Sequence, residues 1–262
     1  MSTAASPAKL VVRGLSKEFV STSGTVLPVL GSIDLEIKSG EFLCIVGASG
    51  CGKTTLIRII DGLMPASTGQ VLLDGTPVAT PGADRGFVFQ QDSLFPWRTV
   101  LDNVAFGLEA QNKPRAASLQ TARELIELVG LRGYERHYPH ELSGGMRQRV
   151  NLARALAIDP EILLMDEPFA ALDALTREVM QRELLRIWEK RRKTVVFITH
   201  QIDEAAYLAD RVVALGGRPG VIKEELVIPF PRPRDLAIKR HPDFLACTQR
   251  LWEMIHGEVG LA

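Results

Sequence analysis

The fold of this chain is decided by one stretch, Gly47-Ala48-Ser49-Gly50-Cys51-Gly52-Lys53-Thr54-Thr55. It matches the pattern G-x-x-x-x-G-K-[ST], in which a glycine-rich loop surrounds phosphate groups. Residues 42–46 before it are all apolar and predict a buried strand, and residues 56–60 after it predict a helix. Because the pattern is informative only between a strand and a helix, this context favours a phosphate-binding loop over a chance glycine-rich turn.

The residue types in this loop suit the binding of a nucleoside triphosphate. Glycines let backbone N–H groups approach phosphate oxygens closely, and the start of the following helix adds partial positive charge. We expect Lys53 to reach the β- and γ-phosphates and the hydroxyl of Thr54 to hold Mg²⁺.

Length and composition are typical of a globular protein. The chain has 262 residues and no formal net charge, so it is long enough for a large core and lacks the positive field that broad nucleic-acid binding requires. Its three cysteines have no metal-ligand spacing and indicate reduced thiols. No apolar run is long enough to cross a bilayer, and residues 1–8 predict a disordered tail rather than a secretion signal. We therefore expect a cytoplasmic protein that reaches a membrane only through a partner.

Strand and helix patterns alternate along the chain, which is typical of a parallel α/β sheet. Strands are expected at residues 10–12, 33–37, 42–46, 71–73, 86–89, 162–165, 194–198 and 211–215. A helical block is expected from about 91 to 160, with its clearest helices at 116–129 and 144–157, and further helices are expected at 174–192 and 244–256. The alternation of apolar and charged residues at 33–37 indicates a sheet with one face in water. Between residue 217 and the terminal helix the periodic pattern is lost.

A second glycine-rich helix start follows Leu142. Ser143 is a good N-cap, but Gly144 and Gly145 then open the helix, and each costs about 1 kcal/mol relative to alanine. A helix start without side chains is a ready site for an anion. In a head-to-tail dimer, Ser143 of one copy would approach the γ-phosphate held by the other. The alternative is a plain serine cap with a flexible entry.

These motifs resemble those of the ATPase subunits of ABC transporters, and residues 142–148 are similar to the signature motif of that family. The resemblance extends from about residue 10 to residue 217. It implies an α/β fold with a P-loop NTPase (RecA-like) core, an antiparallel β subdomain, a helical subdomain inserted at about 91–160, and a C-terminal extension at 218–262. In that family two subunits enclose two ATP molecules. The residues implied to bind ATP in trans are Leu142, Ser143, Gly144, Gly145, Gln148 and Asp173, opposite the partner's residues 47–55.

Two adjacent carboxylates end the apolar run at residues 162–165. Such a pair is costly at the end of a buried strand unless it binds a cation or moves a proton. We expect Asp166 to hold Mg²⁺ and Glu167 to polarise the attacking water as general base. By resemblance this is the Walker B motif with its catalytic glutamate. A helix-capping acidic pair before Pro168 is the alternative.

Two further polar residues follow expected strands. His200 resembles the switch histidine that contacts the γ-phosphate, although a histidine at a strand end is often structural. Gln90 is similar to the glutamine that touches Mg²⁺ and the attacking water, and its neighbour Gln91 fits less well. A glutamine that merely faces solvent remains open.

Two other positions carry a functional and a structural interpretation. Asp173 resembles the D-loop aspartate at the dimer seam and is equally suited to cap the helix that follows. Phe19 matches the aromatic residue that stacks on adenine, and a core phenylalanine is its alternative.

Bulky apolar residues cluster shortly after Gln90. Leu94, Phe95 and Trp97 lie in an expected loop, where exposed apolar side chains often mark a partner surface. In the family this region receives a short helix of the membrane subunit. Packing inside the helical block is the competing interpretation.

Finer features resemble the importer ATPases for nitrate, sulfonates and taurine. They include residues 95–98, 166–173 and 216–220, none of which contains solute chemistry. The resemblance implies a second copy or a close paralogue, integral-membrane permease subunits, an indirect solute-binding protein, no nucleic acid, and a place on the cytoplasmic face of the inner membrane. The alternatives are a soluble ABC-type ATPase of DNA repair or the ribosome and an unrelated P-loop kinase or GTPase. The chain lacks the long coiled coils or basic surface typical of the former, and the latter needs no signature motif.

Overall fold

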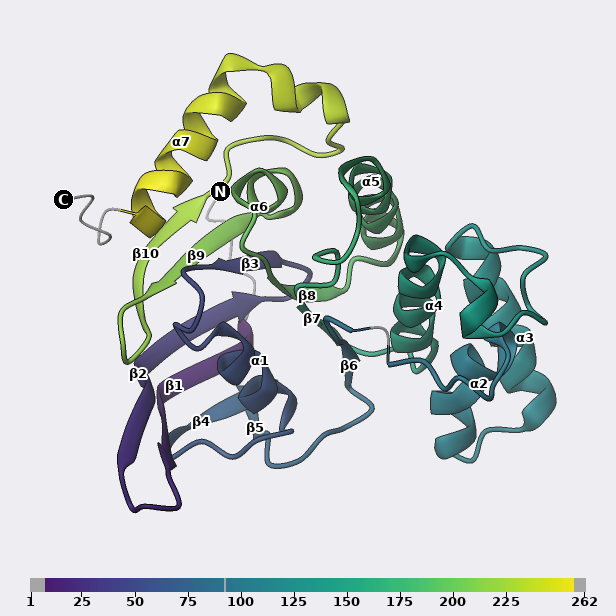
Figure 1. The fold of residues 1–262 in the computed structure, drawn as a ribbon, viewed down its shortest axis with the longest axis horizontal. Helices are drawn as coiled ribbons and strands as arrows, with labels where there is room; N and C mark the ends of the chain where they lie inside the picture. Colours follow the sequence, from purple (N-terminus) through teal and green to yellow (C-terminus); the bar gives the residue numbers. More distant parts are fainter. Residues whose placement is uncertain (1–7, 92, 257–262) are drawn as a thin grey trace, which may run out of the picture. The chain divides into compact units, whose positions relative to one another are not determined.

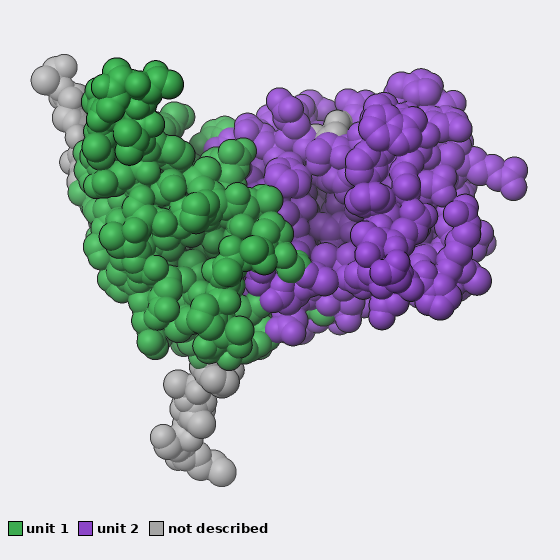
Figure 2. Space-filling view, turned by 90° about the horizontal axis from the view of Figure 1, so that it is seen from below, with its two compact units in different colours: residues 1–82, 193–262 green, residues 83–192 purple. Residues whose placement is uncertain are grey.

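The computed structural model describes residues 8–91 and 93–256, which fall into two compact units. Unit 1 comprises residues 1–82 and 193–262, and unit 2 comprises residues 83–192 (Figure 2). The tail expected at residues 1–8 lies outside the described residues except for Ala8, which begins a strand. Among the described residues, no helix combines the length and apolarity needed to span a membrane.

A largely parallel sheet forms the centre of unit 1 (Figure 1). Its strands are β3 (Phe42–Val46), β8 (Thr194–Ile198), β9 (Arg211–Gly216) and β10 (Val221–Val227). Strand β3 pairs in parallel with both β8 and β9, whereas β10 is antiparallel to β9. Every residue of β3 and β8 is buried, which explains their unbroken apolar sequences. Both strands are confirmed at the predicted bounds.

The second sheet of unit 1 is antiparallel, with the order β2-β1-β4-β5. Its strands are β1 (Ala8–Val20), β2 (Val26–Lys38), β4 (Thr68–Leu73) and β5 (Thr76–Pro77). Ile33, Leu35 and Ile37 are buried while the acidic residues between them are exposed, so the expected wet face is confirmed. Helix α1 (Lys53–Asp61) follows β3, and α6 (Ile202–Leu208) follows β8.

The C-terminal extension is more regular than the sequence indicates. Although the periodic pattern is lost after residue 217, β10 continues the sheet and a short helix, η2 (Leu236–Arg240), follows. Strand β10 is an edge strand with several charged residues, so its apolar signal is weak. Helix α7 (Pro242–His256) is confirmed near the predicted position. It packs against α6 and β9, as Figure 1 shows, and buries Phe244, Cys247, Leu251 and Met254.

Unit 2 contains two parallel strands and most of the helices. Strands β6 (Arg85–Val88) and β7 (Ile162–Asp166) pair with each other. The helices are α2 (Val100–Ala110), α3 (Arg115–Leu128), η1 (Pro139–Glu141), α4 (Gly144–Ala157) and α5 (Ala174–Arg191). Helix α4 packs against both α2 and α3. The helices expected at 116–129, 144–157 and 174–192 are therefore confirmed to within a residue at either end.

Candidate functional site

The loop between β3 and α1 requires glycine at positions where the chain turns sharply. Gly47 has φ of 155°, and a Cβ there would lie 2.0 Å from the carbonyl oxygen of Leu215. A Cβ on Gly52, whose φ is 97°, would lie 2.5 Å from Cδ2 of Leu30. Any larger residue would push the loop out of its place between β9 and β2. The glycines of the motif thus hold the loop against the sheet.

The side chain of Lys53 lies inside this loop. Its Nζ donates hydrogen bonds to the carbonyl oxygens of Gly47 at 2.8 Å and Ala48 at 3.1 Å, and the residue is buried. The loop tip from Ala48 to Gly50 is exposed. A cation held at the centre of an open loop suits an incoming phosphate, so the geometry supports the role predicted for Lys53.

Phe19 lies near the end of β1 and is 38 % exposed. The alternative of a core phenylalanine is therefore wrong. Nζ of Lys17 lies 5.1 Å from the centroid of its ring, which is within reach of a cation–π interaction. Adenine stacking at Phe19 stays a prediction.

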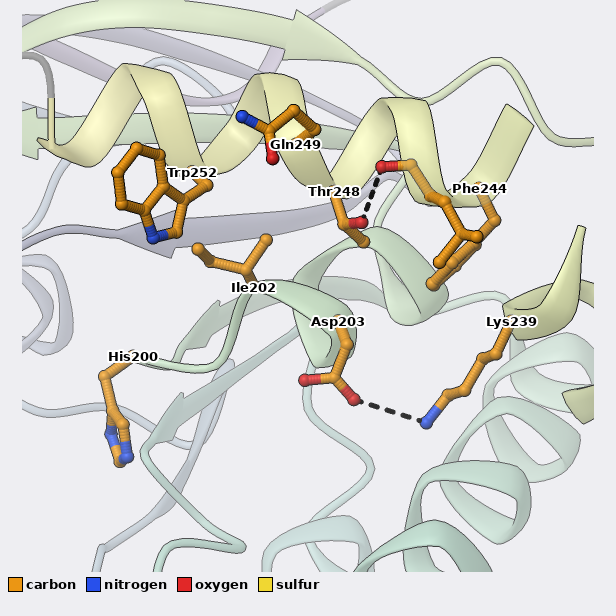
Figure 3. A pocket seen from close by; sticks show the side chains of 9 residues that line it. His200, Ile202, Asp203, Lys239, Phe244, Thr248, Gln249 and Trp252 are labelled. Carbon is orange, nitrogen blue, oxygen red and sulfur yellow. Dashed lines mark hydrogen bonds and ion pairs between the residues drawn. The ribbon is translucent and has the colours of Figure 1, made fainter. Parts of the chain in front are cut away.

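His200 lies at the carboxyl end of β8 and is exposed. The turn that carries it is fixed by Thr199, whose hydroxyl donates to the buried carboxylate of Glu204 and accepts from the N–H of Gln201. A cavity of about 520 Å³ adjoins His200 between α6 and α7, with Ile202 and Trp252 among its lining residues (Figure 3). That the terminal helix lies beside His200 could not be predicted from the sequence, because this relationship is purely tertiary.

In unit 2, Gln90 and Glu167 lie together. Nε2 of Gln90 donates a long hydrogen bond of 3.5 Å to Oε2 of Glu167, so Gln90 does more than face solvent. Asp166 is buried at the end of β7. Glu167 has φ of 45°, a left-handed conformation that costs a non-glycine residue roughly 1–3 kcal/mol and often accompanies function. The carboxylate of Glu167 thus projects from a strained backbone position and has the amide of Gln90 beside it, an arrangement suited to orient a water molecule.

The second glycine-rich helix start has the predicted cap. Oγ of Ser143 accepts a hydrogen bond from the N–H of Met146 at 3.3 Å, and Ser143 and Gly144 are exposed. A Cβ on Gly145 would lie 2.7 Å from Cγ2 of Thr176, so glycine is also needed there for packing on α5.

Two residues of the predicted trans contact are placed differently from expectation. Leu142 is buried, and Gln148 is only 5 % exposed, with no hydrogen bond to its Nε2 from the residues that the structure describes. Gln148 faces inward because α4 packs against α2 and α3, and Leu142, which lies just before this helix, is buried as well. The predicted contact with nucleotide therefore does not extend to these two side chains.

Asp173 caps α5, accepting a hydrogen bond from the N–H of Thr176 at 3.0 Å. The backbone N–H of Thr176, followed by its hydroxyl, holds the pKa of this carboxyl below its usual value. The capping interpretation is confirmed, and the role at a dimer seam stays a prediction that is compatible with it.

The residues predicted to meet a membrane partner divide into two classes. Leu94 is buried, which contradicts its expected part in docking, since its side chain belongs to the core of the unit. Trp97 is 72 % exposed, and Phe95 lies at an apolar cavity of about 420 Å³. The other apolar walls of that cavity were not predicted, because they come from β6, α2 and α4. They are Phe87, Phe106 and Ala155, with Phe89 just beyond β6 and Ile158 just beyond α4.

Comparison with known proteins assigns the family. Residues 30–170, more than half of the chain, match the family described as "ABC transporter". The chain belongs to the ABC transporter family. As a member of this family it is an ATP-binding cassette and an ATPase, and its P-loop NTPase fold is confirmed.

Several individual proteins are similar to this chain over most of its length. This ABC ATPase is 45 % identical over 254 residues to the nitrate import ATP-binding protein NrtD of Synechocystis, covering 95 % of either chain. It is 50 % identical over 225 residues to the taurine import ATP-binding protein TauB of Burkholderia pseudomallei, covering 86 % of either chain. Among solved structures it resembles a dimer of the ATP-binding cassette MJ0796 bound to ADP and phosphate, with a TM-score of 0.75 and 32 % identity over 85 % of this chain and all of that one.

Proposed function

We propose that this chain is the ATP-hydrolysing subunit of an importer of small solutes of the nitrate, sulfonate and taurine kind. The observation that carries the proposal is its high identity, over most of its length, to subunits named for nitrate and taurine import. A protein with this role works at the cytoplasmic face of the membrane and needs permease subunits to hold it there. The relatives favour this function over a soluble ABC-type ATPase.

Nucleotide binding involves two protomers in this proposal. The loop at residues 47–55 of one copy holds the phosphates of ATP, and Ser143 with Gly144 of the other closes over the γ-phosphate. The loop tip from Ala48 to Gly50 and the helix start at Ser143 and Gly144 are exposed and carry small side chains or none, as an anion site requires. The similar cassette with bound ADP and phosphate is itself a dimer.

The chemical step involves Lys53, Gln90, Glu167 and His200. Lys53 exchanges its carbonyl acceptors in the loop for the β- and γ-phosphates. Glu167, oriented by Gln90, accepts the proton of the attacking water, and His200 donates a hydrogen bond to the γ-phosphate. These groups act on charge that develops at the γ-phosphate, which is where fixed dipoles and cations accelerate phosphoryl transfer.

Mg²⁺ fits the donor set when it arrives together with ATP. The described residues hold no group of three or more His, Cys, Asp or Glu able to bind a metal ion by themselves. Mg²⁺ instead prefers one or two carboxylates together with phosphate oxygens. Asp166, buried at the strand end beside Glu167, supplies such a carboxylate, and Thr54 and Gln90 supply neutral oxygens. When bound, the ion neutralises charge on the phosphates.

The membrane partner is proposed to dock at the aromatic cavity of unit 2. Phe95 and Phe106 lie edge to face there, 4.6 Å between ring centroids, and the guanidinium of Arg154, which also lines the cavity, lies 5.9 Å from the centroid of the Phe95 ring. An apolar cavity with a cation at its rim and Trp97 exposed nearby suits a short amphipathic helix. This helix would come from a permease subunit.

The test is reconstitution with a candidate permease and a candidate solute-binding protein from the same organism. In liposomes, the complex should take up nitrate or taurine only with ATP inside, and the loaded binding protein should stimulate hydrolysis. If no permease co-purifies from membranes, and ATP hydrolysis is the same with and without the partners, the transport function is contradicted and the soluble alternative is favoured.

A further inference from the structure

The turn between β9 and β10 is fixed against the phosphate loop. Gly220 donates its N–H to the carbonyl oxygen of Val29 at 2.9 Å and accepts the N–H of Gly31 at 2.8 Å. A Cβ on Gly220 would lie 1.9 Å from the carbonyl oxygen of Cys51, so the two backbones are in contact. The turn is therefore held between β2 and the loop, and a side chain on it has a defined position relative to the nucleotide.

Arg218 is the charged side chain that this turn places over the loop. Its Nη2 lies 3.2 Å from the position that a Cβ on Gly50 would occupy, so the guanidinium contacts the loop where glycine leaves room. Arg218 is exposed, and it forms no hydrogen bond or ion pair with any residue in the part of the chain that the structure describes. An arginine in such a position keeps all its donors available for a ligand.

The surroundings of Arg218 favour an anion. Beside this contact, a cavity of about 230 Å³ is lined by residues of the turn, the loop and the end of α7, among them Ser49, Arg218 and Lys223, and its lining has no carboxylate. Burial raises the pKa of the nearby Cys51 thiol, while the positive charges of Lys53 and Arg218 act in the opposite direction. With the thiol neutral, the lining of this cavity includes cationic side chains and no acidic one.

We propose that Arg218 binds the phosphate groups of the nucleotide held by the loop of its own protomer. The planar guanidinium supplies two parallel donors that match phosphate oxygens, and each bond is charge-assisted. This inference rests on the proposed function, because it takes residues 47–55 as the phosphate-binding loop. It adds a cation from the C-terminal extension to a site otherwise built from the core.

The test compares the affinities of the wild type, Arg218→Ala and Arg218→Lys for MgADP and MgATP, measured by isothermal titration calorimetry. Arg218→Ala should bind both nucleotides about 5- to 20-fold more weakly, which is less than the loss of a buried charged hydrogen bond because the site is exposed. The affinity of Arg218→Lys should lie between those of the wild type and Arg218→Ala, since lysine keeps the charge but lacks the two parallel N–H donors of the guanidinium. Arg13→Ala, which removes an exposed arginine from β1, is the matched control and should bind like the wild type.

Ionic strength provides an independent measurement. The difference in nucleotide affinity between the wild type and Arg218→Ala should shrink as the salt concentration rises from about 0.05 M to about 0.5 M, because added ions screen an exposed charge. Equal affinities of the wild type and Arg218→Ala would overturn the inference, and so would equal losses in the Ala and Lys variants. Failure of the wild type to bind nucleotide would instead contradict the proposed function.

Discussion

The ammonium of Lys53 lies 2.8 Å from the carbonyl oxygen of Gly47, six residues earlier in the same loop. The loop is thus closed around its own cation and keeps a positive centre before any phosphate arrives. This arrangement pre-organises the site, because the positive charge that the phosphates need is already inside the loop.

Replacing Lys53 by alanine should weaken ATP binding about 10- to 150-fold, since a hydrogen bond to a charged group contributes roughly 1.5–3 kcal/mol. Calorimetric titration with MgATP measures the loss. Lys113→Ala, at an exposed position between α2 and α3, is the control and should bind normally. Unchanged affinity in Lys53→Ala would remove this loop from the nucleotide site.

Glu167→Gln keeps the size of the side chain and removes its ability to accept a proton. The turnover number should fall about 10²- to 10⁴-fold, the usual contribution of a general base, while the affinity for ATP is retained. Steady-state phosphate release and equilibrium binding separate the two effects. Near-normal hydrolysis in this variant would show that the base is another group.

Ser143 offers a test that separates helix capping from phosphate binding. Asp and Asn cap helices as well as serine does, so both Ser143→Asp and Ser143→Asn should melt at the wild-type temperature. Only Asp places a negative charge towards the γ-phosphate, so Ser143→Asp should lose ATP hydrolysis while Ser143→Asn keeps part of it. Equal hydrolysis by the two variants would leave Ser143 as a plain cap.

Trp97→Glu should prevent assembly with the permease, because a charge then meets an apolar partner helix. ATP binding should survive, since Trp97 is exposed and distant in sequence from the phosphate loop. Co-purification of the permease from detergent-solubilised membranes measures assembly. Leu245→Glu, which changes an exposed leucine on α7, is the matched control and should assemble normally. A complex of Trp97→Glu that forms as readily as the wild type contradicts docking at this cavity.

Much of the architecture was predictable because its signals are local. The unbroken apolar runs of β3 and β8 and the serine before α4 are visible in any short window of sequence. Strand β10 was missed because a charged edge strand has little apolar pattern. The length of β1 was underestimated for a similar reason, since its last three residues are exposed.

The site was predictable only as separate motifs. Its tertiary relationships were not, because they join distant segments. Arg218 and Gly50, for example, are in contact although they lie far apart in the sequence. Burial of Gln148 depends on which face α4 turns to its neighbours, and periodicity alone does not fix that for a polar residue.

The central claim, that each ATP is bound by the loop of one protomer and the Ser143 helix of the other, is tested most directly by mixing two inactive variants. One carries Lys53→Ala and keeps its Ser143 helix, and the other carries Ser143→Asp and keeps its phosphate loop. A mixed dimer regains one complete site, so the account predicts ATP hydrolysis in the mixture that neither variant shows alone. A mixture that forms mixed dimers, as labelled protomers would report, and yet stays as inactive as its components would contradict it.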